Sequence, residues 1–500
     1  MNARLMYRDR DFELSRTLQP YQADVKNDLE LDTLLKAMAG DDGLIYDVAL
    51  TALMGGIGND ADTVRYRQAI LLDATRNPDV VRELYQLTAA ALEGKRHHYF
   101  GIFLNYPSGI LHDAMDLMRV FVAILRKMRG IADAHLGQFS SEGFSALLKM
   151  LQAEFSDAYV ENIEQHLAYL KLKHGVLESA QLGRGNEGVD YVLRQPNDVG
   201  SSWLARLLRR RPAAYTFRIA ERDEAGFRAL SELRDRGLNL VANALAQSTE
   251  HILSFFEMLR MELAFYIGCL NLGATLSAME APIAIPAVGL PAMGELRFAE
   301  LYDPCLALSM GHRIVGNSVN VGSKPLVIVT GANQGGKSSF LRSIGVAQLM
   351  MQAGMFVAAE SFTSGLHVGL FTHYRREEDD TLKSGKFDEE LARMSRLAEQ
   401  VSPNAMMLFN ESFASTNERE GSEVARQIVE ALLDCGGRVF FVTHMYDFSH
   451  GFVDHPRVDA HFLRAQRMPD GTRTFKLIDE APEETSYGED LYREVFGGSG

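Results

Sequence analysis

A segment in the C-terminal half of the chain has the residue types and spacing of a phosphate-binding loop. Residues 331–338 read GANQGGKS, which matches the pattern GxxxxGK[ST]. In such a loop the backbone N–H groups surround phosphate oxygens, the lysine contacts the β- and γ-phosphates, and the serine hydroxyl binds magnesium. The segment therefore predicts a site for ATP and Mg²⁺, in which Lys337 acts in catalysis and Ser338 is a metal ligand. The residues predicted to bind the nucleotide are Gly331, Ala332, Asn333, Gln334, Gly335, Gly336, Lys337, Ser338 and Ser339.

Two apolar segments further along the chain end in residues suited to ATP hydrolysis. Residues 405–409 are followed by Asn410 and Glu411, and residues 439–443 are followed by His444. In ABC-type ATPases the first of these strands ends in Asp-Glu, where the Asp contacts the water shell of the metal and the Glu polarises the attacking water. We therefore expect Glu411 to be the general base, Asn410 to lie at the metal without the usual charge, and His444 to contact the γ-phosphate. A surface histidine is the alternative for His444.

The segments around these residues alternate between strands and helices. An apolar run at 326–330 precedes the loop, and a helical run at 339–351 follows it. A further helix is expected at 422–433, because two glycines end its pattern. Strands that alternate with helices form mostly parallel sheets. Together with the phosphate loop and the strand-end residues Asn410, Glu411 and His444, this alternation predicts that residues 296–500 form an ABC-type α/β P-loop ATPase domain.

The N-terminal part of the chain is predicted to be mainly helical. Apolar residues at 29–38 recur at three- and four-residue steps, as one helix face requires. Glycine-rich turns and short β-prone runs at 175–223 predict a small β-containing insertion. The apolar run at 255–279 contains Glu257, Arg260 and Glu262, so a buried helix is expected there rather than a membrane span. Residues 1–295 are thus predicted to form a helical core and lever, and the whole chain a multidomain protein.

Composition and charge narrow the class of protein. The chain has 500 residues, too many for one hydrophobic core, and its 46% hydrophobic and 23% charged residues are typical of soluble globular proteins. The net charge of −15 argues against a uniformly basic protein that coats nucleic acid. The three cysteines show no CxxC spacing, and the charged N-terminal residues do not resemble a signal peptide. We therefore expect a cytoplasmic protein that does not associate with membranes.

Three other patterns have ordinary explanations. Residues 183–188 fit GxGxxG, but no convincing strand precedes them, so a hairpin turn is expected rather than a dinucleotide site. His97 and His98 have no carboxylate or cysteine at ligand spacing, which favours a solvated surface over a metal site. The arginines between 206 and 211 are expected on a solvated face or an interface, with contact to DNA phosphates as the alternative.

Five segments resemble the MutS family of ATP-driven mismatch-repair clamps. Residues 330–339 read TGANQGGKSS and resemble the family's TGPNMGGKST, and residues 352–360 resemble its AQIGSFVPAE. Residues 409–421 resemble its MDEIGRGTSTYDG, and residues 440–447 resemble its LFATHYFE. Residues 485–488 resemble the Ser-Tyr-Gly that closes the family's ATPase domain. The order of these segments along the chain is highly specific.

The resemblance implies a DNA-associated ATPase. ABC-type sites are composite, so a homodimer with ATP between its chains is expected, and the family implies binding of double-stranded DNA in repair or recombination. Residues 301–304 resemble the family's lead-in to the ATPase domain. The alternative is an ATP-gated clamp or scaffold in which hydrolysis is vestigial. A P-loop kinase for a small acceptor is disfavoured by Glu411 and His444.

The sequence departs from the family pattern at three places. Asn410 replaces an aspartate, which predicts slow hydrolysis. The signature segment SGRSTFMVEM is shortened at 384–390, where Ser384 is the nearest counterpart of the serine that reaches the partner's γ-phosphate. Residues 1–295 are too few for the family's mismatch-reading and connector domains together with its helical core. We therefore expect a short family member without a recognisable mismatch-reading domain.

Overall fold

The computed structural model describes most of the chain. The described residues are 1–14, 19–98, 106–172, 175–194, 219, 222–289, 294–376, 385–453, 455, 457–468 and 471–483. They form two compact units that alternate along the sequence. The first unit comprises residues 1–3, 82–139 and 145–260, and the second comprises residues 4–81, 140–144 and 261–500. The division of the chain between residues 295 and 296 stays a prediction.

The first unit is built from long helices and a hairpin. Its helical segments lie in α5 (Pro78–His98), α6 (Pro107–His135), the short 3-10 turn η1 (Leu136–Gln138), α7 (Glu142–Glu154), α8 (Asp157–Tyr169) and α10 (Glu224–Ala278). Strands β1 (Glu178–Leu182) and β2 (Gly188–Leu193) pair antiparallel across the 3-10 turn η2 (Arg184–Asn186). Gly183 N–H donates to Glu187 O at 2.8 Å to close this turn. The hairpin turn predicted for the GxGxxG segment is confirmed.

Helix α10 confirms the buried helix predicted at 255–279. Its Glu262 is fully buried, and its carboxylate accepts hydrogen bonds from the backbone N–H groups of Leu5 and Phe12. The Tyr266 hydroxyl donates to Leu5 O at 2.5 Å. Burial raises the pKa of Glu262 to about 7, although the hydrogen bonds oppose this effect. None of the helices in the described ranges has the length and apolar composition needed to cross a membrane.

The N-terminal helices belong to the same compact unit as the phosphate loop. They are α1 (Pro20–Asp28), α2 (Leu31–Ala39), α3 (Gly43–Gly56) and α4 (Ala61–Arg76). Helix α3 packs against α12 (Lys337–Ala353), the helix that follows the loop. A Cβ atom on Gly56 would lie 2.8 Å from the backbone nitrogen of Ala353, so this close approach requires glycine. The Arg67 guanidinium in α4 also donates to Ala353 O at 3.2 Å. The first 80 residues therefore help to anchor α12.

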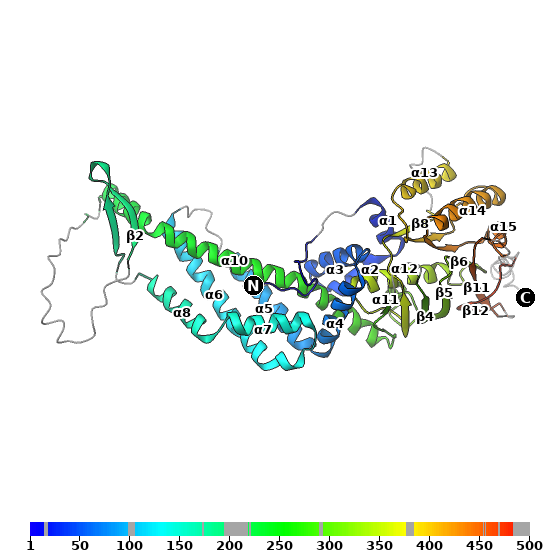
Figure 1. Ribbon diagram of the computed structural model, residues 1–500, viewed down its shortest axis with the longest axis horizontal. Coiled ribbons are helices and arrows are strands. Elements are labelled where there is room, and N and C mark those ends of the chain that lie inside the picture. The colour runs from blue at the N-terminus through cyan, green and yellow to red at the C-terminus, as the bar shows by residue number, and fades with distance from the viewer. Residues whose placement is uncertain are drawn as a thin grey trace, which may run out of the picture. The chain divides into compact units, whose positions relative to one another are not determined.

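A six-stranded sheet supports the phosphate loop (Figure 1). Its order is β12-β11-β6-β10-β9-β8, and all neighbours are parallel except β11 and β12. The strands are β6 (Leu326–Thr330), β8 (Leu370–Tyr374), β9 (Met406–Asn410), β10 (Arg438–Val442), β11 (Ala460–Arg467) and β12 (Arg473–Ile478). The mostly parallel sheet predicted from the sequence is confirmed. Because parallel strands end at one edge, the residues after β6, β8, β9 and β10 meet there.

A smaller mixed sheet and further helices complete the part of the second unit that the structure describes. The sheet has the order β3-β7-β4-β5, with β3 (Ala287–Val288), β4 (Leu296–Leu301), β5 (Asn317–Gly322) and β7 (Ser361–Ser364). The helices are α11 (Pro304–Met310), α12, α13 (Lys386–Ala398), α14 (Glu418–Asp434) and α15 (Tyr446–His450). Helix α14 begins before the predicted residue 422, because the Asn417 side chain accepts a hydrogen bond from Glu420 N–H at 3.0 Å and caps the first turn.

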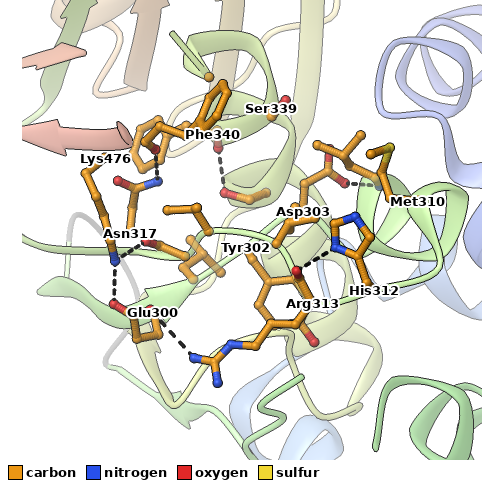
Figure 2. A pocket seen from close by; sticks show the side chains of 18 residues that line it. Glu300, Tyr302, Asp303, Met310, His312, Arg313, Asn317, Ser339, Phe340 and Lys476 are labelled. Carbon is orange, nitrogen blue, oxygen red and sulfur yellow. Dashed lines mark hydrogen bonds and ion pairs between the residues drawn. The ribbon is translucent and has the colours of Figure 1, made fainter. Parts of the chain in front are cut away.

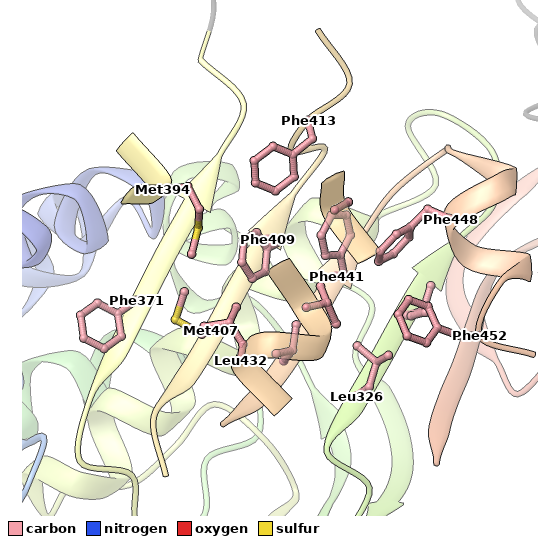
Figure 3. Packing of buried hydrophobic residues seen from close by; sticks show 14 of the residues in the cluster. Leu326, Phe371, Met394, Met407, Phe409, Phe413, Leu432, Phe441, Phe448 and Phe452 are labelled. Atoms are coloured by element: carbon pink, nitrogen blue, oxygen red, sulfur yellow. The ribbon is translucent and has the colours of Figure 1, made fainter. Parts of the chain in front are cut away.

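Aromatic side chains fill the core beside the strands that carry the site (Figure 3). Phe409 on β9 and Phe441 on β10 stack with ring centroids 5.0 Å apart. The Phe448 ring on α15 lies 4.4 Å from the ring of Phe441. Buried rings in contact fill space densely and leave little freedom to shift. The ends of β9 and β10, where the polar residues begin, are thus held in a defined register.

Candidate nucleotide-binding site

The phosphate loop connects β6 to α12 through backbone conformations that require glycine. Gly331 has φ 110° and Gly336 has φ 90°, values that L-residues with a side chain rarely adopt. A Cβ atom on Gly331 would also lie 2.8 Å from the backbone nitrogen of Ala465 on β11. Gly336 is the N-terminal cap of α12, whose first turn therefore starts at the loop. Free N–H groups at a helix N-terminus carry partial positive charge and favour phosphate.

The Lys337 ammonium group lies inside the loop. The side chain is buried, and Nζ donates to Gly331 O and Ala332 O at 2.9 Å each. Burial lowers the pKa of Lys337, while the charge of Glu411 acts in the opposite direction. A cation that has lost most of its water gains strongly from an anionic partner. The position of Lys337 is therefore suited to phosphate oxygens.

Ser338 and Asn410 are in direct contact. The Ser338 hydroxyl, in the first turn of α12, donates to Asn410 Oδ1 at 3.0 Å. Asn410 is the last residue of β9, which β10 separates from β6 in the sheet. The structure thus brings together the two residues that were predicted from the sequence to bind the metal ion. Both supply oxygen atoms, the ligands that magnesium prefers, but neither carries a charge.

Glu411 has a strained backbone. Its φ of 53° is left-handed, a conformation that costs on the order of 1–3 kcal/mol in residues other than glycine and clusters at functional sites. Its N–H donates to Val442 O at 2.9 Å, which ties it to the end of β10. The next residue, Ser412, is buried and donates from its hydroxyl to the backbone carbonyl of His373 on β8. These contacts support the unusual conformation of Glu411.

His373 and Phe413 hold the chain beyond Glu411. Their rings stack with centroids 5.2 Å apart, and His373 Nδ1 lies 2.8 Å from Ser412 Oγ. Burial lowers the pKa of His373 to about 3, so its ring is neutral at physiological pH. Both side chains are buried. His373 therefore positions the loop and does not carry charge into the site.

Most of the predicted site residues line a cavity of about 620 Å³. Lys337, Ser338, Glu411 and His444 line it together, although they come from α12, the end of β9 and the end of β10. Its other lining residues are Leu306, Asn333, Gln334, Gly335, Gly336, Ser339, Arg375 and Phe475. Gly331 and Ala332 do not line the cavity and act through their carbonyl groups on Lys337. Arg375 and Phe475 were missed by the sequence interpretation, because neither belongs to a local motif.

A second cavity of about 590 Å³, whose lining residues Figure 2 shows, adjoins the first. The two cavities share Leu306, Gly336, Ser339 and Phe475. Leu301, Tyr302, Met310, Ile314, Val315 and Phe340 give the second cavity an apolar surface, and the charged residues Glu300, Asp303, Arg313 and Lys476 also line it. Tyr302 belongs to the segment that resembles the family's lead-in to the ATPase domain, and that resemblance was its only signal in the sequence. An apolar cavity beside a phosphate loop fits a flat heterocycle attached to phosphates.

Two family models match separate parts of the chain. Residues 59–279 match the MutS2 N-terminal domain, and residues 327–494 match MutS domain V. The chain belongs to the MutS family. The second match begins within β6 and includes the phosphate loop, Asn410, Glu411 and His444. The roles of these residues in catalysis stay predictions.

Relatives in bacteria and mammals resemble parts of this chain. Human MutS protein homolog 4 is 25% identical over 293 residues, which are 55% of this chain and 30% of that protein. The DNA mismatch repair protein MutS of Chloroflexus aurantiacus is 28% identical over 175 residues, 34% of this chain and 18% of that protein. Endonuclease MutS2 of Lacticaseibacillus casei is 31% identical over 135 residues, 27% of this chain and 17% of that protein. The chain spans less than a third of the length of each of these relatives.

Some of the sequence predictions fall outside the described residues. They concern Ser384, the arginines between 206 and 211, and residues 485–488. The backbones of His97 and His98 lie at the end of α5.

Proposed function

We propose that this chain is a magnesium-dependent ATPase of the MutS family that binds double-stranded DNA and acts in DNA repair or recombination as an ATP-gated homodimeric clamp in the cytoplasm. One observation carries the proposal. Lys337, Glu411 and His444 are far apart in the sequence, yet they line one cavity at the carboxyl edge of a parallel sheet. Ser338 lines the same cavity and contacts Asn410.

The chemistry follows from the positions of these side chains. Lys337 exchanges its contacts with Gly331 O and Ala332 O for phosphate oxygens, and the N-terminus of α12 adds its N–H groups. Glu411 holds the attacking water and accepts its proton, since a positioned general base is typically worth ~10²–10⁴-fold in rate. His444 donates a hydrogen bond to the γ-phosphate. Ser338 and Asn410 would hold magnesium, which would neutralise negative charge on the phosphates.

The second cavity provides a place for the purine base. Its apolar walls begin at Gly336 and Ser339, next to the phosphate loop. Phe475 borders both cavities and is half exposed, so its side chain is accessible to a base. Stacking and apolar contact there favour a nucleotide over free triphosphate.

Asn410 supports a second candidate function. An uncharged residue at the metal weakens the orientation of the metal's water shell, so closure around ATP without efficient hydrolysis is the alternative. Steady-state turnover separates the two functions. Magnesium-dependent release of phosphate that Glu411→Ala removes supports the ATPase. ATP binding without turnover above that of Glu411→Ala supports a clamp or scaffold.

DNA binding is proposed from family membership and from relatives that include a DNA mismatch repair protein. Gel-shift titrations with matched, mismatched, branched and single-stranded DNA, with and without ATP, test it. We expect duplex binding that weakens with salt, because a protein with a net charge of −15 binds DNA through local phosphate contacts. We expect little preference for one mismatch, because no mismatch-reading domain is recognisable in this sequence. No binding to any of these DNAs at low salt would contradict the DNA-binding part of the proposal.

A further inference from the structure

Arg375 lies where the end of β8 meets the end of β9. β8 and β9 are parallel neighbours, with Tyr374 opposite Asn410. The backbone N–H of Arg375 donates to Asn410 O at 2.9 Å, which fixes the start of its side chain beside the predicted metal-binding residue. Arg375 is exposed and lines the 620 Å³ cavity together with Lys337 and Glu411. The backbone thus directs a second cation toward the phosphate site.

The neighbouring arginine has a structural partner, whereas Arg375 faces the cavity. Arg376 forms an ion pair with Asp24 of α1. Burial raises the pKa of Glu390 on α13, and the charge of Arg375 acts in the opposite direction. Within the described ranges, however, no ion pair joins Arg375 to a carboxylate. The acidic run Glu377-Glu378-Asp379-Asp380 follows in the sequence and lies outside the described residues. A nucleotide phosphate is the anion for which the described geometry is suited.

The charges around the site are unusual in two linked ways. Asn410 removes a negative charge from the place where ABC-type sites orient magnesium, and Arg375 adds a positive charge next to it. A guanidinium presents parallel N–H donors that match phosphate oxygens and keeps its charge at every physiological pH. Arginines that contact the γ-phosphate in other nucleotide hydrolases are worth ~10³–10⁵ in rate. Arg375 can therefore supply at the phosphates part of the positive charge that a weakly held magnesium ion would otherwise supply.

We propose that Arg375 binds the γ-phosphate of ATP in its own chain and takes over part of the charge neutralisation that magnesium supplies in related sites. This inference rests on the proposed ATPase function. Two properties follow from it. The chain discriminates ATP from ADP mainly through Arg375, because only ATP has the phosphate that the guanidinium reaches. ATP binding also persists in part when magnesium is removed.

Equilibrium binding by the full chain tests this inference. The ligands are a non-hydrolysable ATP analogue and ADP, each measured in magnesium and in EDTA. Arg375→Ala should weaken binding of the ATP analogue about tenfold or more, since a charge-assisted hydrogen bond contributes about 1.5–3 kcal/mol and 1.4 kcal/mol is tenfold. ADP binding should change less than about twofold. The loss for the ATP analogue should be larger in EDTA, and Arg375→Lys should recover part of it.

Two further variants make the outcomes distinct. Arg376→Ala is the matched control, because it removes an adjacent exposed arginine that pairs with Asp24 and does not line the cavity. It should leave both affinities unchanged. If Arg375→Ala alters neither affinity, or alters both equally, while Lys337→Ala abolishes binding, the inference about Arg375 is wrong and the nucleotide site stands. Wild-type affinity in Lys337→Ala would overturn the site and the inference together.

Discussion

The Ser338 hydroxyl donates its proton to Asn410 Oδ1 across 3.0 Å, between the first turn of α12 and the end of β9. This contact determines which lone pairs and N–H groups of the two residues remain free to bind a ligand. The lone pairs of Ser338 Oγ are free to face a cation, because its proton points at Asn410. Asn410 keeps one lone pair on Oδ1 and its amide NH₂ group, which is a donor. A water bound to a metal is also a donor on its outer side, so it matches that lone pair but not the NH₂ group, whereas both oxygens of an aspartate would accept.

Asn410→Asp should therefore raise ATP turnover and lower the magnesium concentration needed for half-maximal rate. A carboxylate accepts from Ser338 and from a metal-bound water at the same time, and such charge-assisted bonds are roughly twice as strong as neutral ones. ATPase rate measured against magnesium for both forms checks this. The same series with Asn320→Asp, an exposed asparagine of β5 that lines neither cavity, serves as the control.

The opposite outcome has a clear physical cause. A site that has repacked around a neutral residue would have to desolvate a new carboxylate, at a cost of its own. If Asn410→Asp is slower or unchanged at every magnesium concentration, the account of Asn410 as a weakened metal residue is wrong.

Lys337→Ala should abolish tight ATP binding. The substitution removes a buried cation and a donor at the β- and γ-phosphates, and the two loop carbonyls that it contacts lose their partner. Equilibrium titration with a fluorescent ATP analogue measures the loss. Lys324→Ala is the control, because Lys324 pairs with Asp459 outside both cavities. This variant should bind ATP like the wild type.

Glu411→Ala should retain ATP but lower hydrolysis by ~10²–10⁴-fold, since the general base is removed while the phosphate contacts remain. ATP then persists, and sedimentation with ATP and magnesium should show a dimer. Glu423→Ala, which removes an exposed glutamate on α14, should keep the wild-type rate. Normal turnover and a monomer in the Glu411 variant would exclude Glu411 from the mechanism.

Phe475→Ala should weaken ATP binding without a matching loss for inorganic tripolyphosphate. The ring borders both cavities, and stacking of an aromatic side chain on a base is worth ~1–3 kcal/mol. Competition of each ligand against a labelled ATP analogue gives the two affinities. Equal losses for both ligands would mean that Phe475 supports the loop and does not contact the base.

Glu262→Gln should change how stability depends on pH. The folded protein raises the pKa of Glu262 from 4.5 to about 7, so between these values the folded state binds more protons than the unfolded state. Stability of the wild type should therefore fall as pH rises from about 5 to about 8, by on the order of 3 kcal/mol relative to the variant. Denaturant unfolding at both pH values measures this difference. Parallel pH profiles for the two proteins would refute the assignment.

The local parts of the site could be predicted from the sequence. The loop pattern at 331–338 and the apolar run before it predicted β6 at its observed residues, because glycine conformations and strand periodicity are properties of short segments. The strands that end at Asn410 and Val442 were likewise close to prediction. Convergence on one cavity followed from parallel strands that share an edge.

Only the tertiary structure decided which distant residues complete the cavity. Arg375 reaches it because β8 pairs with β9 in a register that places Tyr374 opposite Asn410, and no pattern within β8 encodes that register. Phe475 and Tyr302 line the second cavity from segments more than 150 residues apart. Phe475 has no motif, and the family resemblance of residues 301–304 gave no indication of a cavity. The burial of Glu262 against the backbone of residues 5–12 is likewise a contact between distant segments that no local pattern encodes. Local sequence determines conformation through sterics and periodicity, whereas contacts between distant segments depend on how all the elements pack at once.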